Sequence, residues 1–217
     1  MFNFCMGDED LAEFIGVLLG DGSIGIYKSY VNGNTKIQYR IKITLNSIKD
    51  AEYSLYLSKL FVAIFAQVPK VHKRKNVNAI DLYLLGYEPL HFLLRLGLVL
   101  APKWGRAVIP SYFLRTPLDL FVMRGYMDTD GCICVVNNNG IRYPRIEMKI
   151  CPSPMQSQFI QILTKYGFEP QINHLEKGKI RIALCGINKL KRWDSLIGFS
   201  NKRNITVARS FLDQAAL

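Results

Sequence analysis

Hydrophobic and polar residues alternate most regularly over residues 36–45, where the chain reads KIQYRIKITL. Every second side chain of a β-strand points to the same face of its sheet. One face of this segment is therefore apolar and the other polar and basic, which predicts a half-buried strand. A weaker alternation over residues 145–150 predicts a second strand of the same kind.

Two apolar segments that end in Asp-Gly predict helices over residues 11–21 and 118–130. After each of them the same order of elements follows: strands, a helix, two more strands and closing helices. This order predicts an α+β fold, with one unit used twice and antiparallel sheets whose polar faces are basic. The other predicted elements are helices over 50–65 and 155–166, and strands over 70–75, 79–85, 171–175 and 179–185.

Internal similarity supports this duplication. FIGVLLGDG at residues 14–22 and MRGYMDTDG at residues 123–131 share one pattern, 109 residues apart. LYLLG (82–86) and IALCG (182–186) match at an offset of 100, and Lys103 and Lys202 lie 99 apart. We therefore predict an N-terminal half at residues 1–110, a proline-containing linker at 111–117 and a C-terminal half at 118–217.

Composition restricts the class of protein. The 217 residues are 49% hydrophobic, which is enough for a substantial core and excludes intrinsic disorder. No apolar stretch approaches the roughly 20 residues needed to span a bilayer, and the acidic N-terminus does not resemble a signal peptide. We expect an intracellular protein, cytoplasmic, nucleoid-associated or in an organelle. The net charge of +11 indicates a polyanionic partner, for which nucleic acid is the first candidate.

The cysteines indicate neither a disulfide framework nor a structural zinc site, because five are present without a Cys-x-x-Cys spacing. We expect reduced thiols that lie mostly in the core.

The two Asp-Gly pairs place acids where a helix disfavours them. Asp21 and Asp130 are predicted in the last helical turn, where the helix dipole is negative and an acid costs roughly 0.3–1 kcal/mol. Small residues at i, i+4 would let the helices pack closely and bring the two carboxylates together. A divalent cation would relieve this repulsion, with the carbonyls of Gly20 and Thr129 as further oxygen ligands. Mg²⁺ is the expected ion, with Mn²⁺ as the alternative. Gly22 and Gly131, directly after the acids, suit a left-handed or tight turn out of the helix.

These residues allow two other interpretations. A single Asp-Gly is usually only a turn that ends a helix, but two equivalent copies in a duplicated basic chain favour function. Gly20, Gly22 and Gly25 satisfy the Gly-x-Gly-x-x-Gly spacing. Dinucleotide binding requires these glycines to follow a strand and open a helix, whereas here they close one.

FIGVLLGDG and MRGYMDTDG resemble the two motif copies of single-chain, double-motif LAGLIDADG homing endonucleases, which introns or inteins encode. The resemblance covers essentially the whole chain. It implies two pseudo-symmetric α-β-β-α-β-β-α halves, a central interface formed by the two motif helices, and saddle-shaped sheets over double-stranded DNA. It also implies that Asp21 and Asp130 hold catalytic metal. Leu19 replaces the earlier acid of the motif in the first copy, and Asp128 keeps it in the second.

The resulting hypothesis is a Mg²⁺-dependent, site-specific endonuclease that acts as a monomer without an obligate protein partner. Lys103 and Lys202 are candidates for stabilising the transition state, or otherwise plain phosphate contacts, and the resemblance implies a basic residue in this loop. Their target would be a long, imperfectly palindromic duplex. The alternatives are a non-cleaving nucleic-acid binder, such as an intron-splicing maturase or a regulator, and an unrelated basic α+β protein. The residues predicted to contact DNA are Lys36, Gln38, Arg40, Lys42, Lys70, His72, Arg74, Arg145, Glu147, Lys149, Lys179 and Arg181.

Overall fold

The chain forms two halves with the same succession of elements in a computed structural model, which describes residues 7–31 and 33–214. A short 3-10 helix, Ser111–Leu114, lies between the halves. The first half consists of α1 (Asp8–Leu19), β1 (Gly22–Val31), β2 (Asn34–Asn46), α2 (Ala51–Phe65), β3 (Lys70–Lys73), β4 (Ala79–Leu85) and α3 (Tyr87–Arg95). The second half consists of α4 (Leu118–Asp130), β5 (Gly131–Asn138), β6 (Ile141–Ile150), α5 (Met155–Lys165), β7 (Gln171–His174), β8 (Ile180–Cys185), α6 (Ile187–Leu196) and α7 (Lys202–Leu212).

Each half contains one four-stranded antiparallel sheet, and the two sheets have the same topology. Their strand orders are β1-β2-β4-β3 and β5-β6-β8-β7. The registers also correspond, because Gly22 pairs with Ile43 where Gly131 pairs with Met148. The predicted α+β fold with a duplicated unit is therefore confirmed.

The alternating pattern of β2 decides which face of the first sheet is buried. Ile41, Ile43 and Leu45 are 1%, 0% and 4% exposed, while Lys42 and Thr44 between them point to the opposite face. Burying one such aliphatic side chain contributes roughly 1.5–3 kcal/mol. A register slip of one residue would bury the lysines instead, so the hydrophobic pattern fixes the register.

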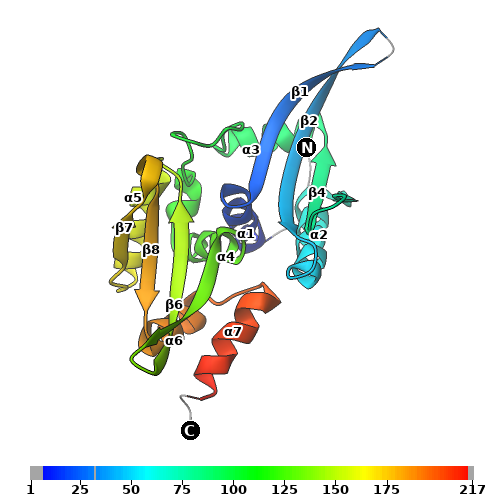
Figure 1. The fold of residues 1–217 in the computed structure, drawn as a ribbon. Helices are drawn as coiled ribbons and strands as arrows, with labels where there is room; N and C mark the ends of the chain where they lie inside the picture. Colours follow the sequence, from blue (N-terminus) through cyan, green and yellow to red (C-terminus); the bar gives the residue numbers. More distant parts are fainter. Residues whose placement is uncertain (1–6, 32, 215–217) are drawn as a thin grey trace.

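The helices α1 and α4 pack against each other at the centre of the molecule, between the two sheets (Figure 1). Their backbones touch at two equivalent glycines. A Cβ added to Gly16 would lie 2.1 Å from the Val122 carbonyl oxygen, and one added to Gly125 would lie 2.0 Å from that of Glu13. The buried carboxylate of Glu13 also pairs with Arg124 across this interface. The predicted two-helix interface is confirmed.

Three local expectations were wrong. Helix α1 ends at Leu19, so Asp21 follows the helix instead of lying in its last turn, whereas Asp130 is the last residue of α4. Gly131 is extended (φ −103°), and Gly22 is not among the glycines with positive φ. Both glycines are needed because strand and helix approach closely: a Cβ on Gly22 would lie 2.4 Å from Leu18 Cα.

The four described cysteines do not lie in the core, contrary to expectation. Cys132 is exposed, and Cys134, Cys151 and Cys185 are partly exposed. In β5 the buried Ile133 directs its two neighbouring cysteines to the open face of the sheet. Cys5 lies outside the described residues. Across the part of the chain that the structure describes, we find no helix with the length and apolarity that crossing a membrane requires.

Candidate active site at the helix ends

The two predicted aspartates lie at the same end of the α1–α4 pair. Asp130 closes α4, and Asp21 follows α1 by two residues. The helix ends meet here, because a Cβ added to Gly20 would lie 2.1 Å from the Thr129 hydroxyl and 3.5 Å from the Asp130 amide nitrogen. Both carboxylates reach the surface. The duplicated helices therefore bring one acid from each half to one site.

The electrostatics of this site oppose two ionised carboxylates. Desolvation and the charge of Asp130 raise the pKa of Asp21 from 3.8 to about 7, although Lys103 counteracts the shift. Burial also raises the pKa of Asp130, opposed by Lys103 and Lys179. Both side chains are accessible, but the surrounding protein displaces enough water to disfavour their charged forms. A bound cation would reverse this preference.

Lys103 lies at the end of α1, beside the aspartates. Its ammonium donates hydrogen bonds to the carbonyl oxygens of Leu18 (3.0 Å), Leu19 (2.7 Å) and Gly20. It thereby satisfies helix-terminal carbonyls that have no partner within the helix. Desolvation lowers the pKa of Lys103, while Asp130, Cys151 and Asp21 raise it. The Gly20 carbonyl, a predicted metal ligand, is thus already an acceptor of the lysine.

Lys202 lies elsewhere. It opens α7 and forms an exposed ion pair with Glu52, with 2.8 Å between Nζ and Oε1. Asn201 occupies the position in the second half that corresponds to Lys103. The carbonyl oxygen of each of these two residues accepts hydrogen bonds from the backbone amides three and four residues later in the chain. The Asn201 side-chain amide also donates to the Asp128 carbonyl oxygen at 3.1 Å, matching the bond from Lys103 to Leu19. The carbonyls at the end of α1 are thus capped by a charged side chain, whereas the end of α4 is capped by a neutral one.

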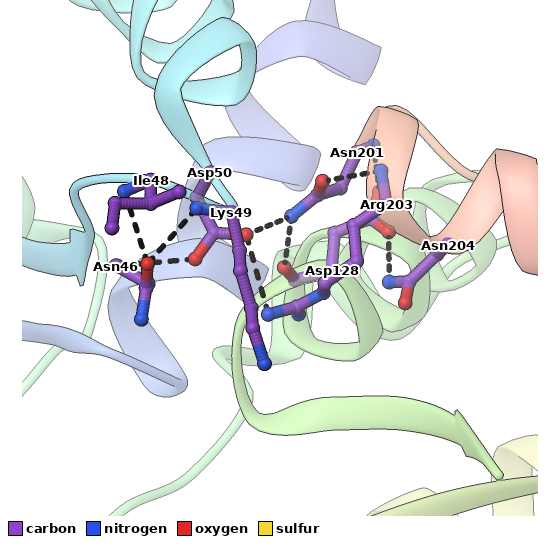
Figure 2. Close-up of polar contacts among 8 residues, drawn as sticks. All are labelled: Asn46, Ile48, Lys49, Asp50, Asp128, Asn201, Arg203 and Asn204. Carbon is purple, nitrogen blue, oxygen red and sulfur yellow. Dashed lines mark hydrogen bonds and ion pairs between the residues drawn. The ribbon is translucent and has the colours of Figure 1, made fainter. Parts of the chain in front are cut away.

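A buried polar network fixes Asn201 in this place (Figure 2). The Asp128 carboxylate accepts hydrogen bonds from the backbone amides of Ser200 (2.5 Å) and Asn201 (2.9 Å) and from the Asn204 side chain (2.8 Å). Burial raises the pKa of Asp128 to about 6, although these three donors oppose the shift. Asp128, the earlier acid of the second motif copy, therefore anchors the loop between α6 and α7.

Asp50 connects the same network to the first half. Its carboxylate accepts from the Asn201 amide (2.9 Å) and pairs with the Arg203 guanidinium (3.2 Å). Asp50 is only 5% exposed, and its charge and that of Arg203 both act on the pKa of Asp21. The network therefore contributes to the potential at the aspartate pair.

A cavity of about 420 Å³ opens beside Asp130. Lys103, Lys149 and Lys179 line it, together with Trp104. The Lys179 ammonium lies 5.3 Å from the centre of the Trp104 ring, a cation–π arrangement that holds it at the cavity wall. Two residues predicted to bind DNA, Lys149 and Lys179, are therefore next to one of the predicted catalytic acids.

A family model described as "LAGLIDADG DNA endonuclease family" matches residues 13–183. The chain belongs to this family. The match includes both motif copies, so the LAGLIDADG resemblance of the two helices is confirmed. A curated relative, the replication factor C small subunit of Methanocaldococcus jannaschii, is 23% identical over 214 residues. The alignment covers 94% of this chain but only 10% of that protein.

Solved structures share the fold over nearly the entire chain. Meganuclease I-SmaMI bound to uncleaveable DNA has a TM-score of 0.71 at 9% identity, covering 97% of this chain and 91% of that one. The I-LtrWI LAGLIDADG homing endonuclease bound to target DNA has a TM-score of 0.68 at 9% identity, covering 97% and 92%. Another I-SmaMI structure, with uncleaved DNA in the presence of calcium ions, has a TM-score of 0.66 at 8% identity, covering 97% and 93%. At these identities the likeness shows the LAGLIDADG fold alone.

The open face of the first sheet carries the basic residues predicted from β2. By register, Lys42 pairs with Tyr83, which in turn pairs with Lys70. Two arginines on this half have defined partners. The Arg40 guanidinium lies 4.0 Å from the centre of the Tyr27 ring, and Arg74 donates twice to the Asp81 carboxylate, at 2.9 and 2.8 Å. The structure brings the other predicted residues of this half, Lys36, Gln38 and His72, to the same sheet.

The second LAGLIDADG sheet has a different open face. Glu147, predicted to contact DNA, is 8% exposed and pairs with Arg145 (2.6 Å) and Arg181 (3.6 Å). Its carboxylate is therefore placed to orient two arginines. Cys132 and Cys134 lie on the same face, with 3.4 Å between their sulfur atoms. Burial and the contact with Cys132 raise the pKa of the Cys134 thiol to about 12.

The sequence interpretation missed Asn201, Asp50 and Asp81. Asn201 could have been found, because asparagine is a preferred helix N-cap and its side chain accepts from the Arg203 amide at the start of α7. Asp50 also stands at a helix N-cap, that of α2, but its bond to Asn201, 151 residues away, had no signal in the sequence. The same holds for the pairing of Asp81 with Arg74, which depends on how β3 and β4 pair.

Proposed function

We propose that this chain is a site-specific endonuclease that hydrolyses phosphodiester bonds of double-stranded DNA. The observation that carries the proposal is the meeting of Asp21 and Asp130 at the shared end of α1 and α4, where each is harder to ionise than an ordinary aspartate. Family membership and the DNA-bound relatives of the same fold support it. A protein that only binds DNA has no need for paired acids at this place.

The donor set fits a hard divalent cation, with Mg²⁺ as the expected ion and Mn²⁺ as the alternative. Asp21 and Asp130 would hold it, and the carbonyl oxygens of Gly20 and Thr129 are further candidates. Such an ion supplies activation of water and stabilisation of the charge that develops on the phosphate. The Thr129 hydroxyl is engaged in its own helix, where it donates to the carbonyls of Gly125 and Tyr126. Only its backbone carbonyl is therefore a candidate ligand.

The basic side chains around the pair would position the DNA. Lys103, Lys149 and Lys179 line the cavity beside Asp130, so a phosphate placed there would meet three ammonium groups. Lys103 is the candidate for transition-state stabilisation through its charge, because it interacts electrostatically with both acids, while its three N–H groups are donated to carbonyls at the end of α1. Lys202 would instead act as an outer phosphate contact, since it pairs with Glu52 on the surface. Both halves belong to one chain, so a monomer would suffice.

The decisive experiment removes one charge at a time from the acid pair. Asp21→Asn and Asp130→Asn should each abolish double-strand cleavage of a selected target with Mg²⁺, while leaving target binding largely intact. The target would first be selected by digesting a randomised plasmid library, with an EDTA control. Asp194→Asn is a matched control, because it makes the same change on the exposed surface of α6.

Full cleavage by either active-site variant would contradict the assignment. If the unaltered protein bound a selected duplex but did not cleave it with Mg²⁺ or Mn²⁺, the alternative of a non-cleaving binder, such as a maturase or regulator, would be favoured instead.

A further inference from the structure

The open face of the second sheet carries a cluster of metal-ligating groups outside the aspartate site. Cys132 and Cys134 lie on this face of β5, and Glu147 of β6 pairs with Cys132 in the register. The two sulfur atoms and a carboxylate oxygen all lie within 4.8 Å of one another. We propose that Cys132, Cys134 and Glu147 bind a Zn²⁺ ion.

The geometry suits tetrahedral zinc. Zn–S bonds of about 2.3 Å at tetrahedral angles place two sulfur ligands about 3.8 Å apart. The sulfur atoms are 3.4 Å apart without an ion, so a shift of a few tenths of an ångström suffices. Cys132 is exposed, which leaves an entry path. Three protein ligands leave one coordination position for water.

A disulfide fits the same pair less well. Residues i and i+2 of a strand have Cα atoms about 6.7 Å apart. This separation is at the upper end of the range found for disulfides, so closing one would distort β5. A metal ion bridges the two sulfurs without such a distortion.

The charges around the cluster allow a cation to enter. Arg145 and Arg181 flank Glu147, which would by itself disfavour a cation. Binding of Zn²⁺ to two thiols releases two protons to solvent, however, so the local charge does not change. One buried oxygen of Glu147, Oε1, lies 2.6 Å from Arg145 but has no aligned hydrogen-bond donor. A zinc ion would be a better aligned partner for this oxygen.

Zinc binding would change how this face meets DNA, a consequence that rests on the proposed function. Once Oε1 of its carboxylate ligates the ion, Glu147 no longer holds Arg145, while Oε2 can still pair with Arg181. The Arg145 guanidinium then becomes available to phosphates or bases under the second half. The first sheet has no equivalent cluster among its described residues, so zinc would affect recognition of only one half-site.

The site is tested by titrating Cd²⁺, a spectroscopic substitute for Zn²⁺, into the purified full-length protein and following thiolate-to-metal absorption in the ultraviolet. We expect a band that saturates at one equivalent and disappears on addition of excess Zn²⁺. Cys132→Ser and Cys134→Ser should each remove it. Cys185→Ser is the matched control, since Cys185 lies on the same sheet but outside the cluster. Glu147→Gln should keep the band but weaken the affinity at least about tenfold.

Absence of the band, or its survival in Cys132→Ser, would overturn the zinc site. Isolation of the protein with a Cys132–Cys134 disulfide that blocks Cd²⁺ uptake would overturn it as well. These outcomes do not depend on DNA cleavage, because the aspartate pair gives no thiolate absorption.

The consequence for recognition is tested with Zn²⁺ and DNA targets altered in one half at a time. Zinc should change the relative affinity for targets altered under the second half and leave the first half unaffected. If the band is present but neither half responds, the proposed effect on recognition is wrong.

Discussion

At the scale of single residues, Asp21 shows how the proposed metal site would lower stability in the absence of an ion. Its pKa of about 7 in the folded protein exceeds the ordinary value of 3.8, because burial and Asp130 disfavour its charge. The stability that the neutral form contributes is fully present below about pH 4 and is lost as the pH rises through 7.

Asp21→Asn should therefore raise the melting temperature in EDTA at pH 8 but not at pH 4. Because the side chain is accessible, we expect only about 1 kcal/mol, or roughly 2–4 °C for a chain of this size. Thermal unfolding followed by circular dichroism at both pH values measures the effect. An equal shift of the melting temperature at both pH values, or a lower melting temperature at pH 8, would contradict the conclusion that ionisation of Asp21 destabilises the fold.

Asp128 has the opposite role, since it stabilises the protein by satisfying buried donors. Asp128→Ala leaves the amides of Ser200 and Asn201 and the side chain of Asn204 without this acceptor. Each unsatisfied buried donor costs about 1–3 kcal/mol, so we expect a loss of at least about 3 kcal/mol in urea-induced unfolding. A loss below about 0.5 kcal/mol, the usual range for surface changes, would show that the network is dispensable.

At the scale of elements, the α1–α4 interface depends on glycine. Gly16→Ala would place a methyl group 2.1 Å from the Val122 carbonyl oxygen, so the helices must separate. Overpacking of this kind costs about 1–3 kcal/mol. The separation should also weaken Mg²⁺-dependent cleavage, because the aspartates at the helix ends would move apart.

Gly7→Ala is the matched control for this substitution. Gly7 precedes α1 with φ −67°, and an added Cβ would meet no atom within 4 Å. Urea-induced unfolding and cleavage assays on both variants compare the two positions. Equal stability of the variants would mean that the helices do not depend on this close approach.

Features that depend on the local hydrophobic pattern could be predicted from the sequence, and features that depend on how elements pack could not. The bounds of α4 and the buried face of β2 could be predicted, because hydrophobic periodicity is local and decides which face is buried. The end of α1 could not, since Gly22 starts a strand directly against Leu18 and stops the helix before Asp21. Cys132 and Cys134 could have been placed on the open face, because the apolar Ile133 between them faces the core.

The candidate site was predictable only in part for the same reason. The two aspartates follow from the repeated motif and the contact between its helices. The pairing of Lys103 with Lys202 rested on their spacing and on the basic residue that the resemblance implies in this loop, but the offset between the halves varies along the chain by several residues. Hydrogen bonds place Asn201 in the position of Lys103, one residue before Lys202. Only the folded chain reveals this difference.

At the scale of the whole molecule, the two halves share a fold but present unlike surfaces. The first sheet exposes lysines and Arg74, whose guanidinium is held by the Asp81 carboxylate. The second offers thiols and a glutamate that pairs with two arginines. Under the proposed function each half would read its own segment of DNA, so the halves of a duplicated chain can diverge in this way. We therefore expect a target whose two halves are similar but not identical.

Two substitutions on the first half should separate attraction to the DNA backbone from reading of its bases. Lys36 is exposed, so its ammonium can reach a phosphate without a fixed orientation. Lys36→Gln should weaken binding to all sequences alike and lower the slope of log affinity against log salt by about 1. Asp81→Asn should instead break the bidentate pairing of Arg74, because an amide keeps only one of the two acceptor oxygens.

Because a bidentate arginine distinguishes bases only when its orientation is fixed, Asp81→Asn should relax discrimination at one base pair by about tenfold to hundredfold. Its salt slope should not fall, since no positive charge is lost. Binding measured across salt concentrations on the selected target and its single-base variants gives both quantities. If Asp81→Asn weakened all sequences equally, Arg74 would be a backbone contact, and base recognition by this half would have to come from β2.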